Sequence, residues 1–139
     1  MATTGTEVRP RVGDTEKLTI NLGVVDLGQI DLLVQEGFYS NRTDLIRTAI
    51  RNQLSVHADA VKRTVARRTL ALGLQHFSRA DLERALAAGQ MLQIQVVGLA
   101  RIASDVPPEL ARATIQSIDV LGAFHPSAAV RSALADRIL

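Results

Sequence analysis

The chain has 139 residues, of which 47% are hydrophobic and 22% are charged, a composition that argues against global disorder. That length allows one domain, or one small module joined to a partner domain. Aromatic residues make up only 3%, so we expect an aliphatic core. The absence of cysteine excludes disulfides and thiolate metal sites and favours a cytoplasmic protein.

The net charge of +2 and the pI of about 9.7 do not by themselves indicate a nucleic-acid partner. Residues 1–68 hold ten Lys and Arg against eight Asp and Glu, whereas residues 69–139 hold six of each. This excess gives weak support for a polyanion-binding surface in the N-terminal half. No apolar stretch approaches the roughly 18 residues of a transmembrane helix, so we expect no membrane contact.

Residues 1–15 are polar and lack the apolar region of a secretory signal, so we interpret them as a flexible tail. Arg9 and Arg11 could contact DNA phosphates from this tail. The favoured interpretation is a disordered tail with no role.

Residues 17–22 alternate polar and apolar side chains, which predicts a strand with one buried face. The polar side chains are Lys17, Thr19 and Asn21, and the apolar ones are Leu18, Ile20 and Leu22. Such a short, one-sided strand cannot be stable alone, and no partner strand lies nearby in the sequence. We therefore expect it to pair antiparallel with the same segment of a second subunit.

Two helices are predicted after this strand. The first contains Ile30, Leu33 and Val34 at helical spacing, with Gly37 as a plausible C-terminal cap. Ser40 is a good N-cap residue for a second helix over residues 41–56. The basic edge of that helix is formed by Arg42, Arg47 and Arg51.

The sequence after residue 57 predicts a mixture of helices and strands. A helix is expected over residues 58–74, and Ser78 and Gly89 bracket another short one. Apolar strands are expected over residues 92–103 and 115–121, separated by a turn at Pro107 and Pro108, and a last helix over residues 130–138.

One weak internal repeat is present, because Ile94–Gly98 resembles Ile118–Gly122. We prefer to interpret the two copies as similar buried strands of one small α+β domain. The alternative is a β-solenoid-like stack that oligomerisation completes.

The stretch Lys17–Leu54 resembles the bacterial ribbon-helix-helix superfamily of the Arc, MetJ and CopG type. The matching features are the alternating strand that begins with a basic residue, then Ile-Asp-x-Leu-Val-x-x-Gly, then Ser-x-Arg-Thr-Asp-x-Ile-Arg. The resemblance covers about 40 residues, under a third of the chain. It implies an intertwined β-α-α dimer whose two-stranded ribbon enters the DNA major groove.

The resemblance also implies residue roles. Lys17, Thr19 and Asn21 match the positions that read base edges. Lys17 can donate to guanine, Asn21 can pair with adenine, and Thr19 can make either contact or pack its methyl group on thymine. The alternative interpretation is that these three side chains form only the solvent-exposed face of an amphipathic strand. Ser40, Asn41 and Arg42 match the phosphate clamp at the start of the second helix. The alternative for the Arg42 side chain is an ion pair within the dimer, with an acidic residue such as Asp44 or Glu36.

Arg63 and Arg67 share one face of the next predicted helix, within a basic cluster with Lys62 and Arg68. They could contact flanking DNA, although a solvated helix face is slightly favoured. His57, His76 and His125 lack paired metal-ligand spacing, so we expect neither a metal site nor a cofactor. No catalytic motif is present, so we do not expect an enzyme.

The sequence thus predicts a tail over residues 1–15, a ribbon-helix-helix domain over residues 16–57, and a C-terminal oligomerisation or sensing domain over residues 58–139. The expected function is a sequence-specific transcriptional regulator, a repressor that binds double-stranded DNA as a homodimer or, through its C-terminal domain, as a tetramer or higher oligomer. The alternatives are an antitoxin and a DNA-organising or plasmid-partition protein.

Overall fold

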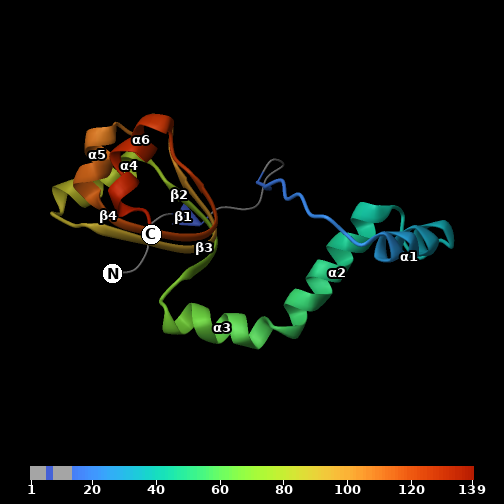
Figure 1. Ribbon diagram of the computed structural model, residues 1–139. Helices are drawn as coiled ribbons and strands as arrows, with labels where there is room; N and C mark the ends of the chain where they lie inside the picture. Colours follow the sequence, from blue (N-terminus) through green and yellow to red (C-terminus); the bar gives the residue numbers. More distant parts are fainter. Residues whose placement is uncertain (1–5, 8–13) are drawn as a thin grey trace. The chain divides into compact units, whose positions relative to one another are not determined.

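The computed structural model describes residues 6–7 and 14–139, which fall into two compact units (Figure 1). The helical unit comprises Lys17–Arg63. The sheet unit comprises Thr64–Leu139 together with the described residues that precede Lys17. The division lies inside helix α3 (Ala58–Arg67), whereas we expect a domain boundary after residue 57.

The helical unit contains the two predicted helices, α1 (Val24–Gln35) and α2 (Arg42–Val56). The predicted strand over residues 17–22 is not formed within the single chain. A strand exists only when a neighbour completes its hydrogen-bond ladder, and the described part of this chain supplies none to the segment. Of the expected β-α-α order, the single chain therefore forms the two helices but not the strand.

Gly37 ends α1 as the sequence predicts. It adopts a φ of 84°, and its N–H donates to the Val34 carbonyl at 3.1 Å. The Phe38 N–H donates to the Leu33 carbonyl at 2.9 Å, which completes a Schellman motif. This sharp end turns the chain toward the start of α2.

The prediction of one helix over residues 58–74 is wrong, because α3 ends at Arg67 and β2 begins at Ala71. Thr69 takes a left-handed φ of 54°, and the Leu70 N–H donates back to the Val65 carbonyl at 2.9 Å. This is the same kind of helix end that Gly37 makes, but with a threonine in the position that favours glycine. No glycine or proline marks the stop, so local patterns carry no signal for it.

The sheet unit alternates strands and helices. Its strands are β2 (Ala71–Phe77), β3 (Leu92–Ile102) and β4 (Ile115–His125), which pair parallel in that order. Its helices are α4 (Arg79–Ala87), α5 (Pro108–Thr114) and α6 (Ala128–Ala133), followed by the 3-10 turn Ala135–Arg137. The mixture of helix and strand agrees with the expected α+β class, but the parallel β-α-β order corrects it toward an α/β arrangement. Periodicity predicts strands and does not reveal their pairing direction.

Part of the expected flexible tail belongs to this sheet. Thr6–Glu7 forms the short strand β1, which pairs antiparallel with β2 opposite His76 and Gln75. Arg9 and Arg11 lie outside the described residues.

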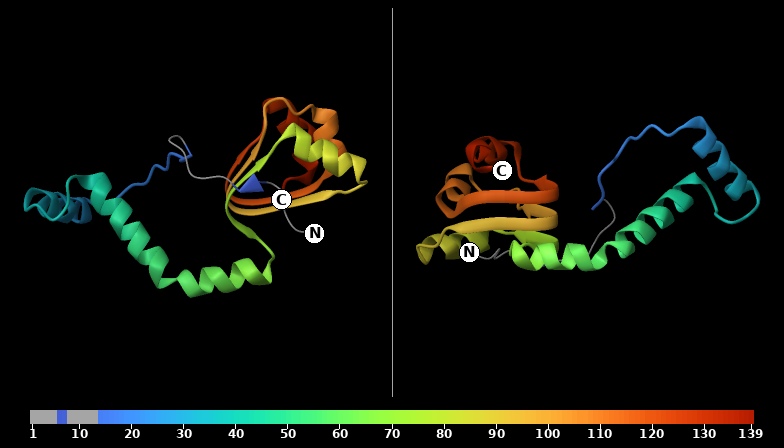
Figure 2. Two further views of the ribbon diagram at one scale, coloured as in Figure 1. Left: turned by 180° about the vertical axis from the view of Figure 1, so that it is seen from behind. Right: turned by 60° about the horizontal axis from the view of Figure 1, so that its bottom comes forward.

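The described core lies between the sheet and its helices. Figures 1 and 2 show α4, α5 and α6 together on one face of the sheet. α4 and α5 each connect two neighbouring parallel strands, and crossovers of one hand place such helices on the same face. Ile94, Val96 and Ile118 of the strands are fully buried on this side, with Leu82 of α4 and Val130 of α6. Apart from Phe77 of β2, the buried hydrophobic side chains described in this core are aliphatic, as the composition predicts.

The internal repeat forms neighbouring parallel strands. Ile94 pairs with Ile118 and Gly98 with Gly122, so the two similar segments lie side by side in register. Gly73 of β2 pairs with Gly98 and extends the row to three strands. The preferred interpretation of two similar strands in one small domain is confirmed for this pair, although Leu121 is 49% exposed rather than buried.

Glycine is required along this row by both conformation and space. Gly73, Gly98 and Gly122 have φ values of 128°, 136° and 122°. A Cβ on Gly98 would lie 2.1 Å from the Gly73 carbonyl oxygen, and a Cβ on Gly122 would lie 2.1 Å from that of Gly98. The backbones of the three strands therefore approach one another in a way that no side chain permits.

Replacing Gly98 with alanine should destabilise the sheet unit strongly. The clash and the backbone strain together should lower the free energy of unfolding by more than about 2 kcal/mol, measured by chemical denaturation. Gly89→Ala is the matched control, because Gly89 also has a positive φ but has no atom within 4 Å of its would-be Cβ. It should cost about 1 kcal/mol, and equal losses in the two variants would contradict the close approach.

Candidate nucleic-acid interface

Residues 17–22 are exposed on both faces in the single chain. Leu18 is 80% exposed and Ile20 is 55% exposed, although their spacing predicts a buried face. Lys17, Thr19 and Asn21 are exposed as well. The structure therefore leaves the polar row accessible, and it leaves the apolar side chains largely or partly exposed, with Leu22 still 40% exposed.

None of the three helices α1, α2 and α3 contains a buried residue. Large apolar side chains of α1 and α2 are exposed instead, including Val24, Val25, Leu32, Ile50 and Leu54. Folding costs roughly 1–2 kcal/mol of conformational entropy per residue, which burial has to offset. A unit without a buried core offsets little of that cost by itself, and its exposed apolar surface is a candidate interface.

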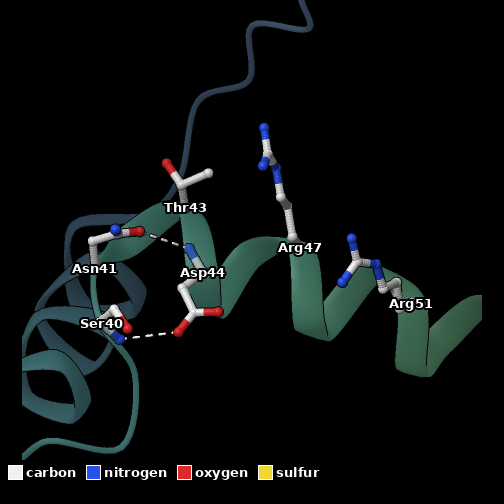
Figure 3. A pocket seen from close by; sticks show the side chains of 6 residues that line it. All are labelled: Ser40, Asn41, Thr43, Asp44, Arg47 and Arg51. Atoms are coloured by element: carbon white, nitrogen blue, oxygen red, sulfur yellow. Dashed lines mark hydrogen bonds between the residues drawn. The ribbon is translucent and has the colours of Figure 1, made fainter. Parts of the chain in front are cut away.

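The start of α2 is capped by Asn41 rather than by Ser40, which corrects the sequence prediction by one residue. The Asn41 side-chain oxygen accepts a hydrogen bond from the Asp44 N–H at 2.8 Å (Figure 3). Ser40 contributes its backbone N–H, which donates to Asp44 Oδ2 at 2.9 Å. The two bonds satisfy one helical donor and fix the carboxylate of Asp44 against the incoming chain.

The backbone donors at the next two positions remain available. Arg42 and Thr43 are the first two residues of α2, so their N–H groups have no acceptor within the helix. The positive end of the helix dipole lies at the same place. This end of α2 is therefore suited to an anion.

A shallow hollow of about 380 Å³ lies beside this helix start and is lined by Ser40, Asn41, Thr43, Asp44, Arg47 and Arg51. Figure 3 shows Thr43, Arg47 and Arg51 following one another along α2. Their spacing of four residues places them on one helix face. Sequence reasoning placed Arg47 and Arg51 on a basic edge, but it did not include them or Thr43 in the phosphate site. The four-residue spacing was the signal.

The side chain of Arg42 is engaged by Asp31 of α1. Nε and Nη2 of Arg42 each donate to one carboxylate oxygen of Asp31 at 2.8 Å. In the single chain Arg42 thus forms an ion pair, but its partner is Asp31, which is not among the predicted partners, rather than Asp44 or Glu36. In this chain Arg42 links α1 to α2 through its side chain.

Hydrogen bonding from Arg42 holds the pKa of Asp31 below its usual range, against a smaller rise from desolvation. A lowered folded-state pKa means that the pair contributes stability above the ordinary pKa of an aspartate. That contribution is lost as the pH falls through the folded-state pKa. Both side chains are about half exposed, so the pair is a minor contributor to stability.

The other residues for which the sequence suggests a role are not among those that line this hollow. Arg63 and Arg67 are exposed on α3, and no ion pair joins either of them to another residue in the described part of the chain. Arg68, from the same basic cluster, pairs with Asp119 at 2.9 Å. Among residues 6–7 and 14–139, no three His, Cys, Asp or Glu side chains are placed to hold a metal ion. None of the helices over the same residues is long and apolar enough to cross a membrane.

Comparison with known proteins gives a family match. A model of the ribbon-helix-helix transcriptional regulator family matches residues 13–131, a range that extends over the helical unit and most of the sheet unit. No curated protein and no solved structure gives a significant match.

Replacing Asn41 with alanine should lower the free energy of unfolding by about 1 kcal/mol, because it removes the cap of α2. Ser40→Ala should be nearly neutral, because only the backbone of Ser40 takes part. Chemical denaturation of the two variants tests which residue caps the helix. A larger loss of unfolding free energy for Ser40→Ala than for Asn41→Ala would show that Ser40 caps the helix and that α2 begins one residue earlier.

Proposed function

The chain belongs to the ribbon-helix-helix transcriptional regulator family, and we propose that it is a dimeric repressor that reads the major groove of DNA with residues 17–22. The observation that carries this proposal is the uncovered apolar surface of the helical unit. Leu18 and Ile20 alternate with polar residues and are exposed, while the helices beside them bury nothing fully.

A second copy of the same segment fits this surface. Two copies of residues 17–22, antiparallel about a two-fold axis, complete each other's hydrogen-bond ladder. Leu18, Ile20 and Leu22 of both copies then face the four helices, and the polar side chains of both strands form one outer row. The same pairing supplies the core that the helical unit lacks by itself.

The outer row has the chemistry of base recognition. Lys17 donates to guanine O6 and N7, Asn21 pairs with adenine N6 and N7, and Thr19 offers a hydroxyl and a methyl group to thymine or its neighbours. A two-stranded ribbon fits the width of the major groove. Six side chains per dimer suffice for a modest recognition site, because one bidentate contact gives about 1–3 kcal/mol of discrimination.

The start of α2 supplies phosphate contacts in this proposal. The backbone N–H groups of Arg42 and Thr43 receive one phosphate, while Arg47 and Arg51 add positive charge along the same face. Ser40 and Asn41 take part by fixing the geometry of this helix start. Arg63 and Arg67 of α3 are proposed to contact flanking DNA.

The sheet unit is proposed to join dimers into tetramers. Leu72, Val97 and Leu121 stand in register on the face that α4, α5 and α6 leave open, and Leu72 and Leu121 are 60% and 49% exposed. Pairing of the helical units already holds two copies together, which raises the effective concentration of this face. A second copy is therefore its proposed occupant. This folded unit disfavours an antitoxin, whose toxin-binding tail would fold only on its partner.

Ile20→Asp should convert the dimer to a monomer, because it places a charge in the shared apolar face. Thr19→Asp is the matched control on the adjacent, outward position, and it should preserve the dimer while abolishing DNA binding. Sedimentation analysis and a DNA-binding assay measure the two effects. A dimeric variant that combines Ile20→Asp with Leu121→Asp, so that the proposed tetramer contact of the sheet unit is also removed, would refute the shared ribbon.

Base reading and phosphate binding should separate in mutants. Asn21→Ala should cost about 1–3 kcal/mol on the specific site and little on random DNA. Arg47→Ala should weaken binding to all sequences alike and reduce the salt dependence of the affinity. The specific site comes from selection of bound DNA from a random pool. Equal loss on specific and random DNA for Asn21→Ala would contradict base reading.

A further inference from the structure

Three side chains that carry or can carry positive charge stand in one row at the carboxyl ends of the parallel strands. His76 of β2 pairs in register with Arg101 of β3, and Arg101 pairs with His125 of β4. Neighbouring strands lie about 4.8 Å apart, so the three side chains start within a short distance of one another. In α/β sheets this edge is where ligands commonly bind.

A hollow of about 410 Å³ lies at this edge and is lined by His76, Arg101, Ile102, Ala103, Ser104, His125, Pro126 and Ser127. Its cationic and imidazole groups come from the three strands, and Ser104 and Ser127 add hydroxyl groups from the loops that follow β3 and β4. Carboxylate oxygens accept hydrogen bonds from all of these groups. The volume suits a small metabolite.

Two carboxylates of the chain itself already bind this row. Arg101 Nη2 donates to Asp14 Oδ1 at 2.7 Å, and the Asp14 side chain is only 4% exposed. His125 Nε2 lies 2.6 Å from Glu16 Oε1. The row therefore binds two carboxylates at once, one on each of two neighbouring strands.

Asp14 and Glu16 lie directly before the segment that is proposed to read DNA. Glu16 immediately precedes Lys17, the first residue of the segment proposed to read DNA. Binding of Asp14 and Glu16 to the sheet unit thus anchors the chain just before that segment. A ligand that binds Arg101 and His125 in place of Asp14 and Glu16 would release the chain at this point.

We propose that this hollow is a binding site for a small dicarboxylate, whose two carboxylates replace those of Asp14 and Glu16 on Arg101 and His125. Only the effect of this displacement on DNA binding rests on the proposed function. The ligand site itself rests on the sheet unit and is tested without DNA.

The test measures succinate binding to the full-length protein by calorimetry. Asp14→Asn combined with Glu16→Gln removes the internal competitors, so succinate should bind about tenfold more tightly than to the unchanged protein if the anchor is closed in about nine molecules of ten. Adding Arg101→Gln to this double variant should abolish binding. Arg112→Gln is the control, because Arg112 pairs with Asp136 and does not line the hollow.

Three outcomes would overturn the proposal. These are equal succinate affinity in the unchanged protein and the double variant, binding that survives Arg101→Gln, and inorganic phosphate that binds the double variant as tightly as succinate. Circular dichroism of each variant establishes that it is folded before binding is measured. A positive result here together with a failed DNA assay would reject the proposed function and leave the ligand site standing.

Discussion

The dominant physical constraint in this protein is the uneven distribution of burial between its two units. Every fully buried side chain described in the chain lies in the sheet unit, in strands β2, β3 and β4, in the helices α4, α5 and α6, and at Leu134 after α6. The helical unit has regular helices, a Schellman motif and a well-formed cap, yet it buries no residue. Local hydrogen bonds shape its helices, but they cannot replace a core, so its stability depends on a second surface.

The start of α2 shows how small local bonds define a candidate DNA contact. Asn41 and Ser40 are both bonded to Asp44, which leaves the N–H groups of Arg42 and Thr43 as the available donors. Asp31 holds the Arg42 side chain, so the charge beside these donors comes from Arg47 and Arg51 instead. Backbone donors and side-chain charge therefore come from different turns of the same helix.

The sheet unit gains its geometry from close backbone contact. Gly73, Gly98 and Gly122 let three strands approach in register, and the same register brings His76, Arg101 and His125 into line three positions later. Asp14 and Glu16 bind to the end of this row immediately before Lys17.

The sequence alone was sufficient for features that depend on neighbours along the chain: both helices of the helical unit, the glycine ends at Gly37 and Gly89, the Ser78 cap and the strand periodicity of β3. It also identified the alternation over residues 17–22 and the similarity of Ile94–Gly98 to Ile118–Gly122. Only the tertiary structure revealed the parallel pairing, the strand at Ala71–Phe77, the Arg42–Asp31 pair and the contacts of Asp14 and Glu16. Periodicity and capping act within a few residues, whereas strand pairing and ion pairs join residues that are distant in sequence and leave no local pattern.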